Sequence, residues 1–139
     1  MESNQNSNRK VFVVLSRTHA KIWKDNFEPN SVPITISKPS INPEYRKMLN
    51  QYFSGRKRGE LDPQFAQKIA DELVDVGALY LAGGGKGKAS AVQNFASYLR
   101  DHHHEIASHI RKIEDIDAEN MTDGQLLAEM RKILDHELK

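Results

Sequence analysis

Residues 78–90 read Ala-Leu-Tyr-Leu-Ala-Gly-Gly-Gly-Lys-Gly-Lys-Ala-Ser, and this stretch decides the class of fold. The apolar start predicts a buried strand, the glycines predict a loop, and the residues that follow have helical spacing. Adjacent glycines permit unusual backbone conformations and the close approach of another molecule. Lys86 and Lys88 add positive charge where a helix start presents free N–H groups. The candidate phosphate-contacting residues are therefore Gly83, Gly84, Gly85, Lys86 and Lys88.

The rest of the chain predicts further strands and helices around this unit. Apolar runs and alternating patterns predict strands at 11–15, 20–24, 32–37, 78–82 and 110–116. Asp62 followed by Pro63 predicts the start of a helix, and Gly77 its limit. Thr122 and Gln125 predict a capping box that opens the last helix. The residues expected on apolar helix faces are Phe65, Ile69, Leu73 and Val74, then Val92, Phe95, Ala96 and Leu99, then Leu126, Leu127, Met130, Ile133, Leu134 and Leu138.

Length and composition bound the classes of protein that fit. The 139 residues, 38% of them hydrophobic, suit a single domain, which we expect over residues 10–139 behind a disordered tail at 1–9. The chain has no cysteine, which excludes disulfides and thiolate chemistry. No apolar run has the length of a membrane span, and the polar start does not resemble a signal peptide. We therefore expect a cytoplasmic protein.

The net charge of +1 conceals an uneven distribution of charge along the chain. Residues 1–100 carry a balance of +6, and residues 101–139 carry a balance of −5. Arg56, Lys57 and Arg58 are consecutive in the sequence between two glycines, and they follow Tyr52 and Phe53. Such a loop suits RNA phosphates, with aromatic rings that stack on unpaired bases. The alternative is an ordinary solvated loop over aromatic residues that fill the core.

Three other chemistries fit the residues poorly. A phosphate-binding loop of the Walker type needs G-x-x-x-x-G-K-[ST], and here Ala82 and Ala89 occupy the first glycine and the hydroxyl position. The histidines at 102–104 are consecutive, so their side chains diverge around a helix and do not converge on one metal ion. A carboxylate cluster for magnesium needs an acid on the first strand, and residues 11–15 supply none. We predict neither a metal nor a cofactor.

The element order resembles the middle domain of the archaeo-eukaryotic peptide-chain release factors and Pelota, and more closely its short bacterial relatives. Those relatives are labelled release-factor-like, host-attachment or translational machinery proteins. The segments that carry the resemblance are 11–23, 62–69, 79–86 and 117–127. The resemblance implies a single ribonuclease-H-like α/β domain, with a mixed sheet of about five strands and helices packed on it.

One departure from that family bears on chemistry. Release factors carry a Gly-Gly-Gln loop ahead of the first helix, whereas this chain has Ser-Gly-Arg-Lys-Arg-Gly-Glu at 54–60 and no Gly-Gly-Gln. The resemblance therefore implies a translation-associated, noncatalytic domain that contacts ribosomal or transfer RNA through basic loops. The alternatives are a protein-interaction module that pairs through a sheet edge or the last helix, for example as a homodimer, and a nucleotide hydrolase that uses the glycine-rich loop.

Overall fold

Five strands form one mixed sheet in the order β3-β2-β1-β4-β5. The structure is a computed structural model that describes residues 9–16, 19–37, 62–84 and 91–138. β1 is antiparallel to β2 and parallel to β4, β2 is antiparallel to β3, and β4 is parallel to β5. The predicted mixed α/β sheet is confirmed. The strands are β1 (Lys10–Leu15), β2 (His19–Lys24), β3 (Ile34–Ser37), β4 (Ala78–Gly83) and β5 (Ile110–Asp115).

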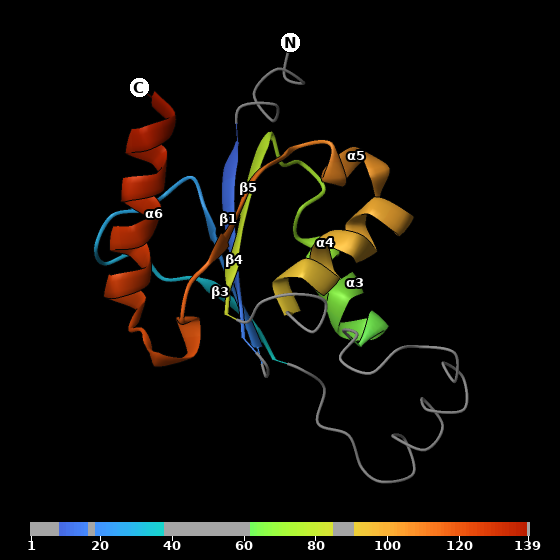
Figure 1. Ribbon diagram of the computed structural model, residues 1–139, viewed down its shortest axis with the longest axis horizontal. Coiled ribbons are helices and arrows are strands. Elements are labelled where there is room, and N and C mark those ends of the chain that lie inside the picture. The colour runs from blue at the N-terminus through green and yellow to red at the C-terminus, as the bar shows by residue number, and fades with distance from the viewer. Residues whose placement is uncertain (1–8, 17–18, 38–61, 85–90, 139) are drawn as a thin grey trace, which may run out of the picture.

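Helices cover both faces of this sheet (Figure 1). On one face lie α3 (Pro63–Asp71), α4 (Ala91–His102) and the short α5 (His104–Ala107). On the other face lies α6 (Asp123–Leu138), which follows the 3-10 turn η2 (Ala118–Asn120). Each parallel connection therefore passes through helices on a face of the sheet, as expected for parallel strands.

Two of the predicted helix starts are confirmed by their hydrogen bonds. The buried Asp62 carboxylate accepts a hydrogen bond from the backbone N–H of Gln64 at 2.9 Å, with Pro63 in the first helical turn. Thr122 Oγ1 accepts from the N–H of Gln125 at 3.2 Å, and Gln125 Oε1 accepts from the N–H of Thr122 at 2.9 Å. This reciprocal pair is the capping box that the sequence predicts.

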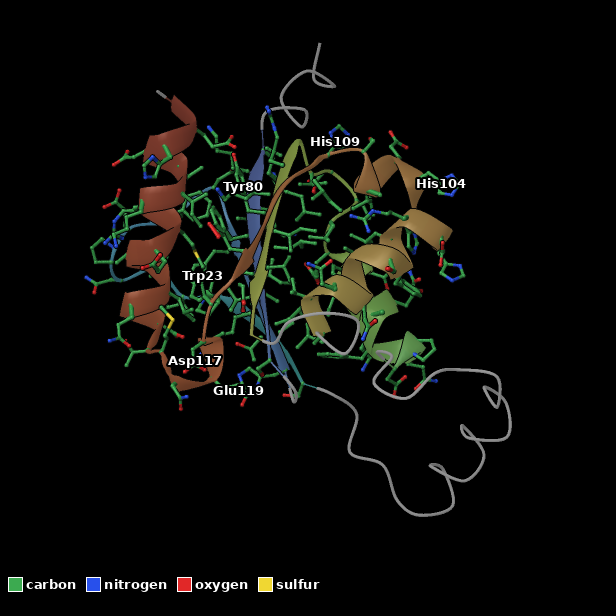
Figure 2. The ribbon with its side chains drawn as sticks, viewed as in Figure 1. Trp23, Tyr80, His104, His109, Asp117 and Glu119 are labelled. Carbon is green, nitrogen blue, oxygen red and sulfur yellow. The ribbon has the colours of Figure 1, made fainter. Side chains whose placement is uncertain are left out.

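The sheet divides the interior into two cores, and the central strand β1 contributes side chains to both. Val11, Val13 and Leu15 face α3 and α4, whereas Phe12 and Val14 face α6. Alternate side chains of a strand point to opposite faces, so a continuous apolar run fills both cores at once. Figure 2 shows Trp23 and Tyr80 between the sheet and α6. The predicted apolar faces of α4 and of the first three turns of α6 are confirmed, with Leu134 partly buried.

Val74 departs from the predicted helix face. Its side chain is 78% exposed, although Phe65, Ile69 and Leu73 are fully buried as predicted. The helix ends at Asp71, and the N–H groups of Glu72 and Leu73 bond to carbonyls three residues back. This tighter turn changes the direction of the side chains that follow, so the helical spacing no longer holds at Val74.

The Tyr80 hydroxyl makes the stability of the fold depend on pH in the alkaline range. It donates a hydrogen bond to Glu137 Oε1 at 3.0 Å. Burial, then this hydrogen bond and the Glu137 charge, raise the Tyr80 pKa from 10.0 to about 12. Stability from the neutral hydroxyl is complete below the unfolded-state pKa of 10.0 and is lost as the pH rises toward about 12.

We expect urea denaturation of the Tyr80→Phe variant to lack this alkaline loss of stability. The comparison variant is Tyr98→Phe, because the Tyr98 hydroxyl donates instead to Gln67 Oε1 on the other face of the sheet. Burial and then the Asp71 charge raise the Tyr98 pKa too, so this variant is expected to lose only the Tyr98 part of the alkaline loss and to keep the Tyr80 part. An equal alkaline loss in the wild type and in Tyr80→Phe would contradict the assignment.

Candidate functional site

The carboxyl ends of the parallel strands meet at one edge of the sheet, here named the carboxyl edge. Leu15 pairs with Gly83, and Gly83 pairs with Asp115, so β1, β4 and β5 end side by side. The N–H of Ile116 bonds to the Gly83 carbonyl at 2.9 Å and fixes the exit from β5. Ligands of open α/β sheets bind in the crevice outside such strand ends.

Both sequence-predicted basic segments join the described structure at the carboxyl edge. Residues 85–90 connect Gly84 to the start of α4, and residues 38–61 connect Ser37, the carboxyl end of β3, to Asp62. Ser37 pairs with His19 at the start of β2, so β3 ends at the same edge. The predicted phosphate-contacting residues Gly85, Lys86 and Lys88, and Arg56, Lys57 and Arg58, lie outside the described residues, and their role stays a prediction.

Close packing explains glycine at position 83. A Cβ added to Gly83 would lie 2.8 Å from the Leu15 carbonyl oxygen and 3.3 Å from Val92 Cβ. At Gly84 an added Cβ would lie 3.2 Å from the Ile116 carbonyl oxygen. Neither glycine has a left-handed backbone. The first two glycines of the predicted loop thus let neighbouring segments approach closely, and phosphate contact at them stays a prediction.

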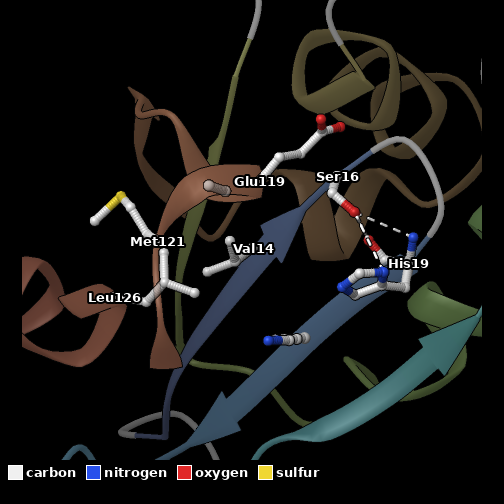
Figure 3. Close-up of a pocket in the computed structure, with 8 residues that line it drawn as sticks. Val14, Ser16, His19, Glu119, Met121 and Leu126 are labelled. Atoms are coloured by element: carbon white, nitrogen blue, oxygen red, sulfur yellow. Dashed lines mark hydrogen bonds between the residues drawn. The ribbon is translucent and has the colours of Figure 1, made fainter. Parts of the chain in front are cut away.

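A cavity of about 420 Å³ opens at the carboxyl edge on the α6 side, and we name it the edge cavity (Figure 3). Its polar side chains come from Ser16 after β1, from β2 and from η2, with Glu119 extending toward the end of β1. Its apolar side chains come from β1, η2, the residue after η2 and the first turn of α6. The described residues that line it are Val14, Ser16, His19, Lys21, Ala118, Glu119, Met121 and Leu126.

Hydrogen bonds and one ion pair fix the polar wall of the edge cavity. Ser16 Oγ donates to the His19 carbonyl at 3.1 Å and accepts from the His19 N–H at 3.2 Å. Lys21 Nζ bonds Asp123 Oδ1 at 2.5 Å, which ties β2 to the start of α6. This pair is partly exposed, so its main effect is to position the wall, and its contribution to stability is small.

Ser16 and His19 do not form a nucleophile and base. The Ser16 hydroxyl directs its proton to a backbone carbonyl, and its oxygen lies 3.5 Å from His19 Nδ1, too far for efficient proton transfer. Ser16 therefore closes the β1–β2 connection. The edge cavity is suited to bind a ligand and lacks an activated serine.

A second cavity of about 360 Å³ lies between the end of α3 and α5. His103 Nε2 lies 2.9 Å from Gln67 Oε1, which also accepts from the Tyr98 hydroxyl at 2.6 Å. His109 lies toward the sheet edge opposite Glu119 (Figure 2). Among residues 9–16, 19–37, 62–84 and 91–138, no group of three histidine or carboxylate side chains is arranged to hold a metal ion.

The residues of the edge cavity were not singled out from the sequence. They come from two segments about 100 positions apart, which carry part of the family resemblance but contain no catalytic or ligand-binding motif. The available signal is topological: once β1 and β5 are known to be parallel and to flank β4, Ser16 and residues 116–119 are placed at one edge. Strand order is set by long-range pairing, which local patterns do not encode.

The fold is similar to that of a solved archaeal protein. Pelota from Archaeoglobus fulgidus superimposes with a TM-score of 0.51 at 16% sequence identity, over 97% of this chain and 38% of that chain. The archaeal translation termination factor aRF1 gives a TM-score of 0.45 at 14% identity, over 95% of this chain and 41% of that chain. This chain therefore spans less than half the length of either protein.

These likenesses concern the fold. No protein-family model matches the sequence, and no curated protein matches it. The fold is like that of Pelota, as the sequence resemblance implies, whereas activity depends on the residues of a site. In the part of the chain that the structure describes, no helix is long and apolar enough to cross a bilayer.

Proposed function

We propose that this chain is a translation-associated, noncatalytic release-factor-like domain that contacts ribosomal or transfer RNA at its carboxyl edge. The observation that carries the proposal is the meeting of both predicted basic segments with this one edge. The sequence resemblance supplies the link to translation, and the Pelota-like fold is consistent with it. The proposal includes the placement among short bacterial relatives, the domain limits at 10–139 and a cytoplasmic location.

Helix direction supports an anionic partner at this edge. α4 and α6 both start after strands that end there and run back toward the opposite edge (Figure 1). Their N-termini therefore carry partial positive charge to the side where Ser37 and Gly84, the last described residues before the two basic segments, lie. Phosphate contacts made in this way fix position and give little sequence preference.

The experiment is to measure binding to purified ribosomes and to transfer RNA over a series of salt concentrations. Three or more phosphate contacts on single-stranded RNA predict that log K falls with log salt with a slope of about −2 or steeper. Co-sedimentation at low salt and its loss at high salt are the expected results. A chain that binds neither RNA at low salt would contradict the proposal.

The leading rival is a protein-interaction module, and the exposed Val74 beside the second cavity favours it. Binding through that surface, or pairing of two copies, would depend little on salt and would require no RNA. Ribosome binding that survives both ribonuclease digestion of the exposed RNA and high salt would support this rival. A shift of the melting temperature by ATP or GTP with magnesium would support the nucleotide hydrolase.

A further inference from the structure

We propose that the second cavity binds a peptide segment of a protein partner that presents an arginine beside a large apolar side chain. The cavity volume of about 360 Å³ falls within the range of about 300–1,000 Å³ typical of ligand sites. Val76 and His109 line it and lie just ahead of β4 and β5, so the cavity lies at the amino ends of these strands. In Figure 2, His109 and Glu119 accordingly lie at opposite ends of the sheet. The inference therefore goes beyond the proposed RNA contact and does not depend on it.

An apolar floor and an exposed valine supply the hydrophobic part of this site. Ala70, Val76 and Ile106 line the cavity and are buried. Val74 lines it as well, yet its side chain is 78% exposed. An apolar side chain seated in the cavity would cover Val74 along with the floor, and removal of this surface from water would stabilise the complex.

The turn that carries Val74 is held in place without a partner. Glu72 and Asp75 flank Val74 in this turn, and they pair with Lys24 at 3.2 Å and with Arg9 at 3.2 Å. A surface that is already ordered loses little conformational freedom on binding. The two pairs also neutralise both acids, so the charge that a partner meets comes from other residues.

The polar part of the lining carries negative charge. Asp71 accepts a hydrogen bond from Gln67 Nε2 at 2.8 Å and keeps its charge, because the amide is neutral. In the part of the chain that the structure describes, the exposed Glu105 carboxylate forms neither a hydrogen bond nor an ion pair. The described lining residues include no lysine or arginine that could neutralise these two carboxylates. The cavity is therefore complementary to a cationic group.

His103 adds a third hydrogen-bond acceptor to the lining. Gln67 Nε2 donates to Asp71, so the amide oxygen of Gln67 is the atom that accepts from the Tyr98 hydroxyl at 2.6 Å. His103 Nε2 lies 2.9 Å from the same oxygen and must therefore donate its proton to it. The neutral ring then keeps Nδ1 as an acceptor. Asp71, Glu105 and His103 together favour a partner group that only donates.

Arginine meets these requirements better than lysine or RNA does. Its planar guanidinium has five N–H donors, no acceptor and a permanent positive charge. It bonds carboxylates in pairs and is less strongly hydrated than the lysine ammonium group. RNA phosphates would be repelled by the two carboxylates, so the partner at this end of the sheet is a protein.

The first test selects peptides from a random phage-displayed library against the full chain. Enriched peptides are expected to combine arginine with leucine, isoleucine or phenylalanine. The strongest of them, made synthetically, should shift the NMR methyl signals of Val74, Val76 and Ile106. Exchange of its arginine for uncharged citrulline should weaken binding about tenfold. Enrichment of no peptide or of acidic peptides, or shifts confined to other residues, would overturn the proposal.

Val74→Ser tests the hydrophobic part of the site with little risk to the fold, because the side chain is exposed. We expect a loss of about tenfold in affinity for the selected peptide, since less apolar surface is buried on binding. The matched control is Val32→Ser, which replaces a valine that is 87% exposed and does not line the cavity. Equal affinities of the two variants would contradict the docking of the peptide on Val74.

Glu105→Gln tests the charge and keeps the size of the side chain. We expect about threefold weaker binding of the arginine peptide, as for loss of one exposed ion pair, and no change for the citrulline peptide. The matched control is Glu129→Gln on α6, whose carboxylate pairs with Lys132 and does not line the cavity. The same loss for both peptides would show that Glu105 does not face the arginine.

Transfer RNA binding separates this inference from the proposed function. Val74→Ser and Glu105→Gln should bind transfer RNA as the wild type does, because both residues lie at the end of the sheet opposite the carboxyl edge. Peptide binding at the second cavity without any RNA binding would support the peptide site and contradict the proposed function. Salt-dependent RNA binding with no selected peptide would contradict the peptide site and leave the RNA-contacting domain standing.

Discussion

Replacing Gly83 with valine is expected to lower the free energy of unfolding by about 3 kcal/mol, at the upper end of overpacking costs. The first added carbon would lie 2.8 Å from the Leu15 carbonyl oxygen and 3.3 Å from Val92 Cβ. The Leu15 oxygen belongs to the backbone of the central strand, so it moves only if β1 and β4 separate. Since domains are stable by about 5–15 kcal/mol in total, the loss is large.

Urea denaturation of the wild type and of Gly83→Val measures this difference in the free energy of unfolding. The control is Gly124→Ala in the first turn of α6, where an added Cβ meets nothing nearer than Thr122 Oγ1 at 3.9 Å. Alanine there is expected to raise stability by roughly 0.5–1 kcal/mol, because glycine is the poorer helix former. Equal stability of Gly83→Val and the wild type would show that β1, β4 and α4 do not pack as described.

Exchanging Arg56, Lys57 and Arg58 for glutamate is expected to weaken RNA binding by at least a hundredfold at about 0.1 M salt. Loss of three phosphate contacts removes about 2 from the slope of log K against log salt, which is about two powers of ten at this salt concentration. Like-charge repulsion from the three glutamates adds to the loss. The fold should be unaffected, so the circular dichroism spectrum and the melting temperature should match those of the wild type.

A charge-matched control separates this local effect from a change of net charge. Lys68, Lys112 and Lys132 are exposed and lie on α3, β5 and α6, away from the carboxyl edge. Their replacement by glutamate changes the net charge by the same amount, and we expect it to cost much less affinity. Similar losses of RNA affinity in the two triple variants would mean that binding depends on the overall charge of the protein and not on the basic segment at 54–60.

The strands were largely predictable because their signals are local. The run at 11–15 is continuous and apolar, as a strand buried on both faces requires, and it became β1. The starts of α3 and α6 were predictable because capping chemistry resides within three residues. The prediction that Val74 is buried was wrong, because the tight turn that ends α3 is set by tertiary packing. Helical spacing in the sequence carries no information about that turn.

The candidate site was predictable only in part. Gly83 and Gly84 lie at the carboxyl edge because they end a parallel strand, and the sequence already indicated a strand there. The edge cavity could not be predicted, because Ser16 and Glu119 converge only through the parallel order of β1, β4 and β5. Parallel neighbours are joined by long connections, so their order is a property of the whole chain.

The unequal cover of the two cores has a consequence for solubility. Within the described residues, the face that carries Phe12, Trp23 and Tyr80 is covered by one sixteen-residue helix, α6, whereas the opposite face is covered by three helices. Transient detachment of α6 would expose a contiguous aromatic and aliphatic strand surface, which is the kind of surface that drives aggregation. The Lys21–Asp123 ion pair and the Tyr80–Glu137 hydrogen bond tether the two ends of this helix to the sheet. They therefore help to keep the protein in solution as well as to stabilise its fold.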